Sequence, residues 1–262
     1  MSPWRTCTSA RWAASSLTRQ LRAILALVWF DGLLPIRRSP FSMVNFIVSP
    51  LTILFFIDVF AGPSRAVFAL GGGLIAVIVG SCIILETEAA FLRLVVKLQD
   101  MFVSSPLSPI TYVVGLSTAQ LCNGIAGIVL FSVLLGLYAK ISALGAVEIA
   151  LAALITWASI SALGFMVSTF ARDVRDLWVY SPLLNVVLAF LSPVFYPLSL
   201  IPSSFQFIAY LSPTTYPARI IQGATGLVSL SPLELQLDFA GGIAYTLFLI
   251  GIAAKMSKWR QT

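Results

Sequence analysis

The stretch AVFALGGGLIAVIVGSCIIL, from Ala66 to Leu85, decides the fold, because it contains no charged residue along its whole length. A helix of roughly 20 mostly apolar residues is long enough to cross the hydrocarbon core of a bilayer. The whole chain shares this character, since 59% of its residues are hydrophobic and 10% are charged. Soluble domains carry about 25% charged residues, which hydrate their surfaces. The sequence therefore predicts an all-α polytopic membrane protein.

Further apolar stretches on both sides of this segment bring the expected number of transmembrane helices to six. One precedes it, at about 41–60, and four follow it, at about 110–138, 143–170, 177–195 and 239–254. A Gly-Pro turn at residues 61–65, AGPSR, joins the first two spans as an antiparallel pair. We expect a cytoplasmic tail over residues 1–16 and the membrane domain over residues 17–262.

The N-terminal segment has an amphipathic pattern over residues 17–28, with Arg19 and Arg22 beside its apolar face. Such a pattern indicates a helix lying in the interface of the inner leaflet. A frayed first span is the alternative interpretation. Asp31 and Pro35 interrupt the apolar run that follows, so a cleaved signal peptide is not expected.

The distribution of positive charge predicts the orientation in the membrane. With the N-terminus inside, thirteen of the 16 lysines and arginines fall in inner segments, and only Arg65, Lys140 and Arg219 fall outside. Cytoplasmic segments carry the excess of positive charge in membrane proteins. We therefore expect a multi-pass protein of the cytoplasmic membrane with both termini in the cytoplasm.

The segment between the fifth and sixth spans, residues 192–226, is too apolar for a hydrated loop. Its five prolines rule out one continuous helix. Two short helices that dip into the outer leaflet as a re-entrant hairpin satisfy both conditions, whereas a plain apolar loop packed on the spans is the alternative. The residues expected to shape this hairpin are Pro197, Pro202, Pro213 and Tyr216.

Several classes of chemistry are not expected in this chain. It contains no histidine and no GxxxxGK[ST] run, so neither a usual general base nor a phosphate-binding loop is present. Its three cysteines have no paired spacing, which gives no disulfide or metal framework. The positive charges do not gather on one face, so no nucleic-acid binding is predicted.

Uncharged polar residues lie near the middle of three predicted spans. These are Gln120, Asn123, Thr156, Ser159 and Asn185. They are expected either to form hydrogen bonds between helices or to line a pathway. Asp58 and Glu148 fall near span ends, where they are solvated, and the lack of a central carboxylate argues against an ion-coupled carrier.

Small residues recur every fourth position in the second span, at Gly72, Ala76 and Gly80. This pattern allows close helix approach, either within the chain or between two subunits.

The order of these segments resembles the permease subunit of ABC type-2 transporters, the class that exports polysaccharides, lipids and drugs. Two stretches carry the resemblance: KLQDMFVSSPLSPITYVVG at 97–115, which is similar to the inner-loop signature, and LSPVFYPLSLIPSSFQFIAYLSPTTYPARII at 191–221, which is similar to the outer hairpin. The chain departs from the family pattern at residues 98–101, where Leu-Gln-Asp-Met stands in place of Gly-Thr-Leu-Glu.

The resemblance implies a transport subunit that is not itself an enzyme and holds no cofactor. ATP and magnesium would bind a separate ABC ATP-binding subunit, and a second permease subunit, identical or related, would complete a dimer in the membrane lipid. An inner coupling helix would transmit the motion, although an ordinary solvated loop is the alternative. The coupling residues implied are Arg93, Lys97, Leu98, Gln99, Asp100, Met101 and Phe102, with Arg172 and Arg175 in the next inner link. Trp157 and Phe190 would join the mid-depth polar residues along the pathway.

The function expected on these grounds is the permease of an ATP-driven exporter of an amphiphilic substrate. An ATP-independent membrane carrier or assembly protein is the alternative.

Overall fold

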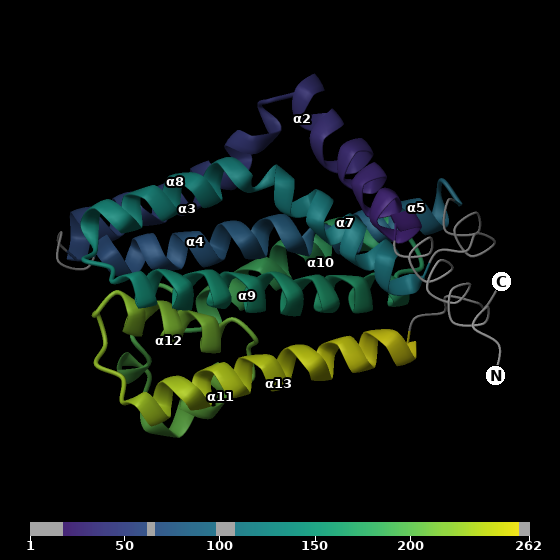
Figure 1. Ribbon diagram of the computed structural model, residues 1–262. Helices are drawn as coiled ribbons and strands as arrows, with labels where there is room; N and C mark the ends of the chain where they lie inside the picture. The colour runs from purple at the N-terminus through teal and green to yellow at the C-terminus, as the bar shows by residue number, and fades with distance from the viewer. Residues whose placement is uncertain (1–17, 62–65, 98–107, 257–262) are drawn as a thin grey trace, which may run out of the picture.

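The computed structural model describes residues 18–61, 66–97 and 108–256, and all regular elements in these ranges are helical (Figure 1). Within this part of the chain, three helices are long and apolar enough to cross a membrane, and a bent pair of helices makes a fourth candidate. The expectation of an all-α membrane protein is therefore confirmed. The number of six spans stays a prediction.

Three long helices form the body of the molecule: α4 (Ala66–Ile83), α9 (Ala143–Phe170) and α13 (Pro232–Met256). They run side by side in Figure 1, with α9 between the other two. Helix α4 is buried on most of its circumference, including Leu70, Ile75 and Val79. A helix that is apolar all round is typical of such a central position.

Two groups of shorter elements lie at opposite ends of these helices (Figure 1). We call the end that carries α5 (Leu85–Leu94) the α5 end, and the end that carries α11 (Gln206–Tyr210) and α12 (Thr215–Ala224) the α12 end. Helix α3 (Ser42–Ala61) packs on α4, and α10 (Val174–Val186) continues into the π-helical segment η3 (Val187–Leu191).

The third predicted span, 110–138, is not one straight helix. It consists of α7 (Pro109–Asn123) and α8 (Ile125–Tyr138), which are bent by 62° around Gly124. A Cβ atom on residue 124 would lie 2.8 Å from Ser81 Oγ on α4. Glycine therefore allows the chain to bend while it passes close to the central helix.

Two other helix boundaries also differ from the expected ones. The second span does not stop at Leu85, because α5 follows α4 after a single turn residue and buries Glu86 completely. The last helix begins at Pro232 rather than near residue 239. Ser231 caps it, and the Glu234 carboxylate accepts hydrogen bonds from Ser231 N and Oγ at 2.8 and 2.7 Å. This reciprocal capping box, with proline in the first turn, is a strong helix start.

The N-terminal helix covers residues 18–27 and continues through the π-helical segment η1 (Val28–Leu33) into α2 (Leu34–Arg38). Asp31 and Gly32 therefore do not break it, because the wider π-helical turn absorbs them. This helix packs on α7, where Gly115 makes room for Leu27. Its predicted position in the inner leaflet stays a prediction.

The proline-rich segment between η3 and α13 folds as a series of short helices. Pro197 and Pro202 each precede a 3-10 turn, Leu198–Leu200 and Ser203–Phe205. Helices α11 and α12 follow, with buried Pro213 between them. Short helices therefore do form in this segment, and α12 packs against α9. The re-entrant position of the segment in the outer leaflet stays a prediction.

Candidate functional site

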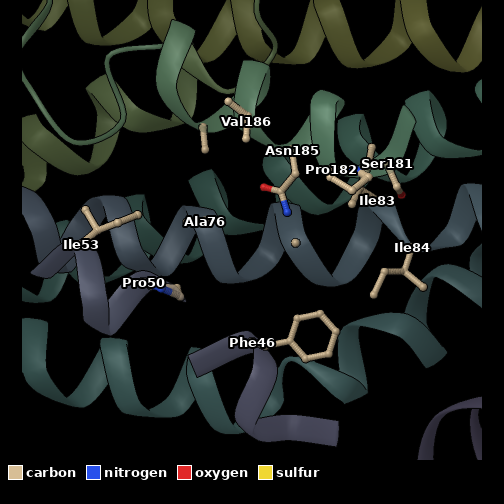
Figure 2. Close-up of a pocket in the computed structure, with 12 residues that line it drawn as sticks. Phe46, Pro50, Ile53, Ala76, Ile83, Ile84, Ser181, Pro182, Asn185 and Val186 are labelled. Carbon is tan, nitrogen blue, oxygen red and sulfur yellow. The ribbon is translucent and has the colours of Figure 1, made fainter. Parts of the chain in front are cut away.

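A groove of about 370 Å³ lies between α3, α4 and the segment from α10 to η3. Figure 2 shows Phe46 on α3 across from Asn185 on α10. We call it the α3–α4–α10 groove. Its lining is Phe46, Pro50, Ile53, Ala76, Gly80, Ile83, Ile84, Ser181, Pro182, Asn185, Val186 and Ala189. Among the described side chains that line it, none is ionisable, and the polar ones are the Asn185 amide and the Ser181 hydroxyl.

Small residues of α4 leave the space that the groove occupies. A Cβ on Gly80 would lie 3.5 Å from Asn185 Nδ2 and 3.9 Å from Phe46 Cδ1. Gly72, two turns earlier, lies against the Phe195 ring and the Val194 carbonyl. The small-residue stripe of the second span therefore faces α10, η3 and the residues after η3 in the same chain.

Gln120 and Asn123 belong to a different polar cluster, on α7 and the N-terminal helix. Asn123 Nδ2 donates to Gln120 Oε1 at 3.1 Å, and Gln120 Nε2 donates to the Asp31 carboxylate at 2.9 Å. Burial raises the pKa of the Asp31 carboxyl, and the hydrogen bond from Gln120 acts in the opposite direction. The cluster fixes the N-terminal helix to α7. It does not open on the α3–α4–α10 groove, whose lining includes neither amide.

The predicted pathway residues of α9 lie in a third place. Thr156 and Ser159 are buried and donate to carbonyls of their own helix, Ala152 and Ile155, at 2.8 and 2.7 Å. Trp157 lines two apolar grooves of about 280 and 740 Å³, on the side of α9 toward α7 and α8. The backbone of Phe190 is in η3, and its side chain lies outside the described part of the structure. The six predicted pathway residues whose side chains are described therefore lie in three separate places, and the pathway role of all seven stays a prediction.

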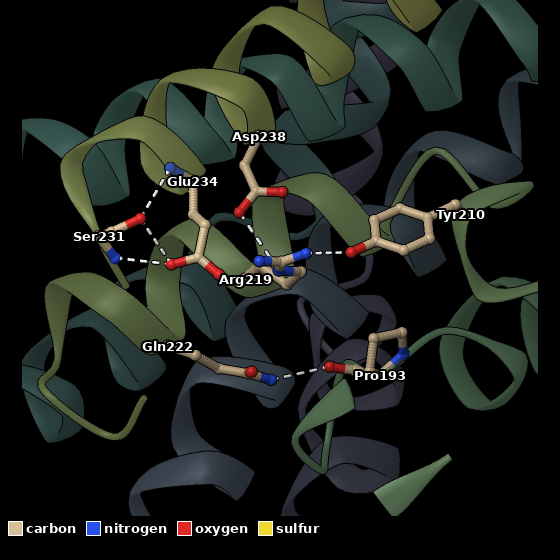
Figure 3. A network of polar contacts seen from close by, with 7 residues as sticks. All are labelled: Pro193, Tyr210, Arg219, Gln222, Ser231, Glu234 and Asp238. Carbon is tan, nitrogen blue, oxygen red and sulfur yellow. Dashed lines mark hydrogen bonds and ion pairs between the residues drawn. The ribbon is translucent and has the colours of Figure 1, made fainter. Parts of the chain in front are cut away.

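At the α12 end, an ion pair joins α12 to α13. Arg219 Nε lies 3.2 Å from Asp238 Oδ2, and both side chains are largely buried, 14% and 4% exposed. Arg219 Nη1 also donates to the Tyr210 hydroxyl (Figure 3). The Tyr216 ring lies between those of Tyr210 and Tyr245 in tilted contacts, with centroid distances of 5.9 and 6.3 Å.

The same network holds the hairpin to the end of η3. Gln222 Nε2 donates to the carbonyls of Pro193 and Tyr196 at 2.8 and 3.2 Å. The Thr214 hydroxyl donates to the Leu188 carbonyl at 2.7 Å. The hairpin is therefore a packed element joined to the groove-lining segment, not a loose loop.

At the α5 end, the predicted coupling residues are in part described. Leu98, Gln99, Asp100, Met101 and Phe102 lie outside the described residues. Lys97, Arg172 and Arg175 are exposed. Arg93 is different, because its guanidinium donates to the carbonyls of Ser168, Thr169 and Ala171 at the end of α9.

Sequence reasoning missed two acidic residues that matter here, Asp31 and Asp238. In the sequence, Asp31 is recognisable only as an interruption of an apolar run, not as a partner of α7. Asp238 was placed just outside the last span, although the Ser231-Pro232-Leu233-Glu234 start signal was present in the sequence. That signal moves the helix start earlier and places Asp238 two turns into α13.

A family model described as ABC-2 type transporter matches residues 22–225, which is more than half of the chain. No curated protein matches the chain.

Proposed function

Because the chain belongs to the ABC-2 type transporter family, whose membrane domains are permeases of ABC transporters, we propose that it exports an amphiphilic substrate across the cytoplasmic membrane. A separate ATP-binding subunit supplies the energy, since the chain has no phosphate-binding loop. The family match carries this proposal. ATP and magnesium belong to the partner subunit.

We assign the pathway to the α3–α4–α10 groove. Its lining combines an aromatic ring and aliphatic side chains with one amide and one hydroxyl, which suits the apolar and hydrogen-bonding parts of an uncharged amphiphile. Trp178, Val179 and Leu183 of α10 are 73%, 63% and 59% exposed. A second permease subunit against this apolar face would enclose the groove.

The proposed orientation places the α5 end in the cytoplasm and the α12 end outside. In a background without the three native cysteines, a membrane-impermeant maleimide applied from outside should label Ser203→Cys and leave Lys255→Cys unlabelled. Both positions are exposed, so accessibility in the folded chain is matched. Detergent should make Lys255→Cys reactive. The reverse pattern in intact cells contradicts both the orientation and export.

The Asn185 amide should contribute to substrate affinity. Asn185→Leu keeps a similar volume and removes the hydrogen-bonding group, so the substrate concentration for half-maximal ATPase stimulation should rise about three- to tenfold. Thr156→Val is the comparison, because that hydroxyl is already bonded to the Ala152 carbonyl, and it should have little effect. The half-maximal concentration of both variants is measured by titrating substrate into the reconstituted complex and following ATP hydrolysis. Equal effects of the two substitutions would remove the groove from the pathway.

Docking of the ATP-binding subunit tests the function itself. We propose that Met101 and Phe102 are apolar anchors and that Asp100 is a rim charge, since buried apolar anchors dominate interfaces and rim charges contribute less. The chain should co-purify with a co-expressed ATP-binding subunit and change its rate of hydrolysis. Met101→Ala with Phe102→Ala should reduce co-purification several-fold, whereas Asp100→Ala alone should have a smaller, salt-sensitive effect. Substrate movement without any ATP-binding subunit would instead favour a carrier.

A further inference from the structure

The end of α9 is closed by a side chain from another helix. Arg93 Nη2 lies 2.7 Å from the Ser168 carbonyl oxygen and 2.9 Å from that of Ala171. Arg93 Nη1 lies 3.3 Å from the Thr169 carbonyl oxygen. The last carbonyls of a helix have no partner within it, and its C-terminus carries partial negative charge. The planar guanidinium satisfies several of these acceptors at once, which an ammonium group does less well.

These carbonyls belong to the junction that starts the groove-lining helix. Ala171 is the C-terminal cap of α9, and Asp173, two residues later, is the N-terminal cap of α10. Asp173 Oδ1 accepts a hydrogen bond from Arg175 N at 3.0 Å. Arg93 therefore holds α5 to the α9–α10 junction. Helix α10, which begins at this junction, carries Asn185 into the groove.

The body of α5 packs closely enough to move with this junction. Ala89 and Ala90 on α5 are almost completely buried, and Leu85 shares an apolar cluster with Phe165 of α9. Helix α5 also packs against α10. Helix α5 ends at Leu94, one residue after Arg93, and Lys97, four residues after Arg93, has a left-handed backbone with φ of 55°. Arg93 is thus the last charged contact between α5 and the rest of the bundle before the predicted docking segment.

We propose that Arg93 is a positioning residue that acts within the chain: it clamps α5 to the α9–α10 junction, so that movement of α5 is passed to the groove. This inference rests on the proposed function for the source of the movement. It changes the role of Arg93 from a contact for the ATP-binding subunit to a link between helices. Docking should therefore survive the loss of Arg93, and coupling should not.

The functional arm of the test uses Arg93→Met, Arg93→Lys and the control Arg38→Met in the complex with the ATP-binding subunit. Arg38 is exposed on α2, so the control makes the same chemical change away from the junction. Arg93→Met should co-purify normally and retain basal hydrolysis, with about tenfold less substrate transported per ATP. Arg93→Lys should fall between wild type and Arg93→Met, and Arg38→Met should match wild type. If Arg93→Met no longer co-purifies with the ATP-binding subunit, Arg93 is a docking contact and the proposal is overturned.

The structural arm uses the chain alone, so it does not depend on the proposed function. Spin labels at Phe91 and Phe170, which are 40% and 60% exposed, report the spacing of α5 and the end of α9 by pulsed EPR. The distribution of distances between the two labels should be narrow in the wild-type background and in Arg38→Met, and broad in Arg93→Met. An unchanged distribution in a monodisperse Arg93→Met sample overturns the clamp. A broad distribution with normal coupling overturns its transmission role. If Arg93→Met gives a broad distribution but the wild-type chain does not stimulate the ATP-binding subunit, the clamp is supported and the proposed function is contradicted.

Discussion

Replacement of Asp238 by alanine should lower the free energy of unfolding by about 3–5 kcal/mol, because it leaves a buried charge without its partner. The Arg219 side chain reaches from α12 to α13 and is 14% exposed, and its Nε atom lies 3.2 Å from the Asp238 carboxylate. The Tyr210 hydroxyl accepts a hydrogen bond from the same guanidinium but carries no charge. The hairpin would then be held to α13 by uncharged contacts, such as the 2.6 Å bond from the Tyr245 hydroxyl to the Leu211 carbonyl.

Three further variants separate the charge effect from lost packing. Asp238→Asn keeps an acceptor for Arg219 and should cost less than Asp238→Ala. Adding Arg219→Met to Asp238→Ala removes the orphan charge and should restore part of the lost stability. Asp58→Ala changes an exposed carboxylate and should shift stability by less than about 0.5 kcal/mol. The free energy of unfolding of all four variants can be measured in mixed micelles, with tryptophan fluorescence as the signal. A double variant less stable than Asp238→Ala would contradict the explanation.

The second large effect is expected for Gly72→Ala, which should cost about 1–3 kcal/mol through overpacking. A Cβ at this position would lie 2.5 Å from Phe195 Cδ1 and 2.7 Å from the Val194 carbonyl oxygen. The ring can rotate away, but the carbonyl belongs to the backbone that follows η3. Relief of the clash therefore moves the residues that directly follow the groove-lining segment of α10 and η3.

Gly136→Ala is the matched control on α8. Among the described residues, no atom outside the adjoining turns of α8 lies within 4 Å of a Cβ built at Gly136, so the methyl group meets no neighbouring helix there. Alanine is the better helix former, and this variant should be more stable by about 0.5–1 kcal/mol. The two identical substitutions thus have opposite expected signs in the same unfolding experiment. Two stabilising results would show that α4 and the segment after η3 are less closely packed than described.

The helical class and the chain breaks at the prolines were predictable because each depends on local sequence. Apolar length indicates a span wherever it occurs, and Pro197 and Pro202 restrict the backbone whatever surrounds them. Both prolines begin short turns in the structure. The capping signal at Ser231 is equally local, and it would have extended the last helix to its observed start.

The bend at Gly124 and the separation of the polar residues depend on tertiary contacts. Nothing near Gly124 in the sequence shows that Ser81 lies against it. In the same way, sequence places Thr156 and Asn185 at similar depth, yet one donates to its own helix and the other lines the groove. The partner of Arg93 could not be predicted either, because it is a set of backbone carbonyls 75 to 78 residues away.

The central position of α4 sets a condition on how the protein is made. Several of the helices that pack around α4 come later in the chain, among them α8, α9 and α12. When α4 leaves the ribosome, α3 is already made but these later neighbours are not, so lipid has to solvate the surfaces of α4 that they will cover. The three consecutive glycines from Gly71 to Gly73, which later contact Ile221, Phe195 and Phe131, must wait for partners made up to about 150 residues afterwards. Hydropathy therefore has to hold α4 in the bilayer first, and close packing can stabilise it only when the last of these helices is complete.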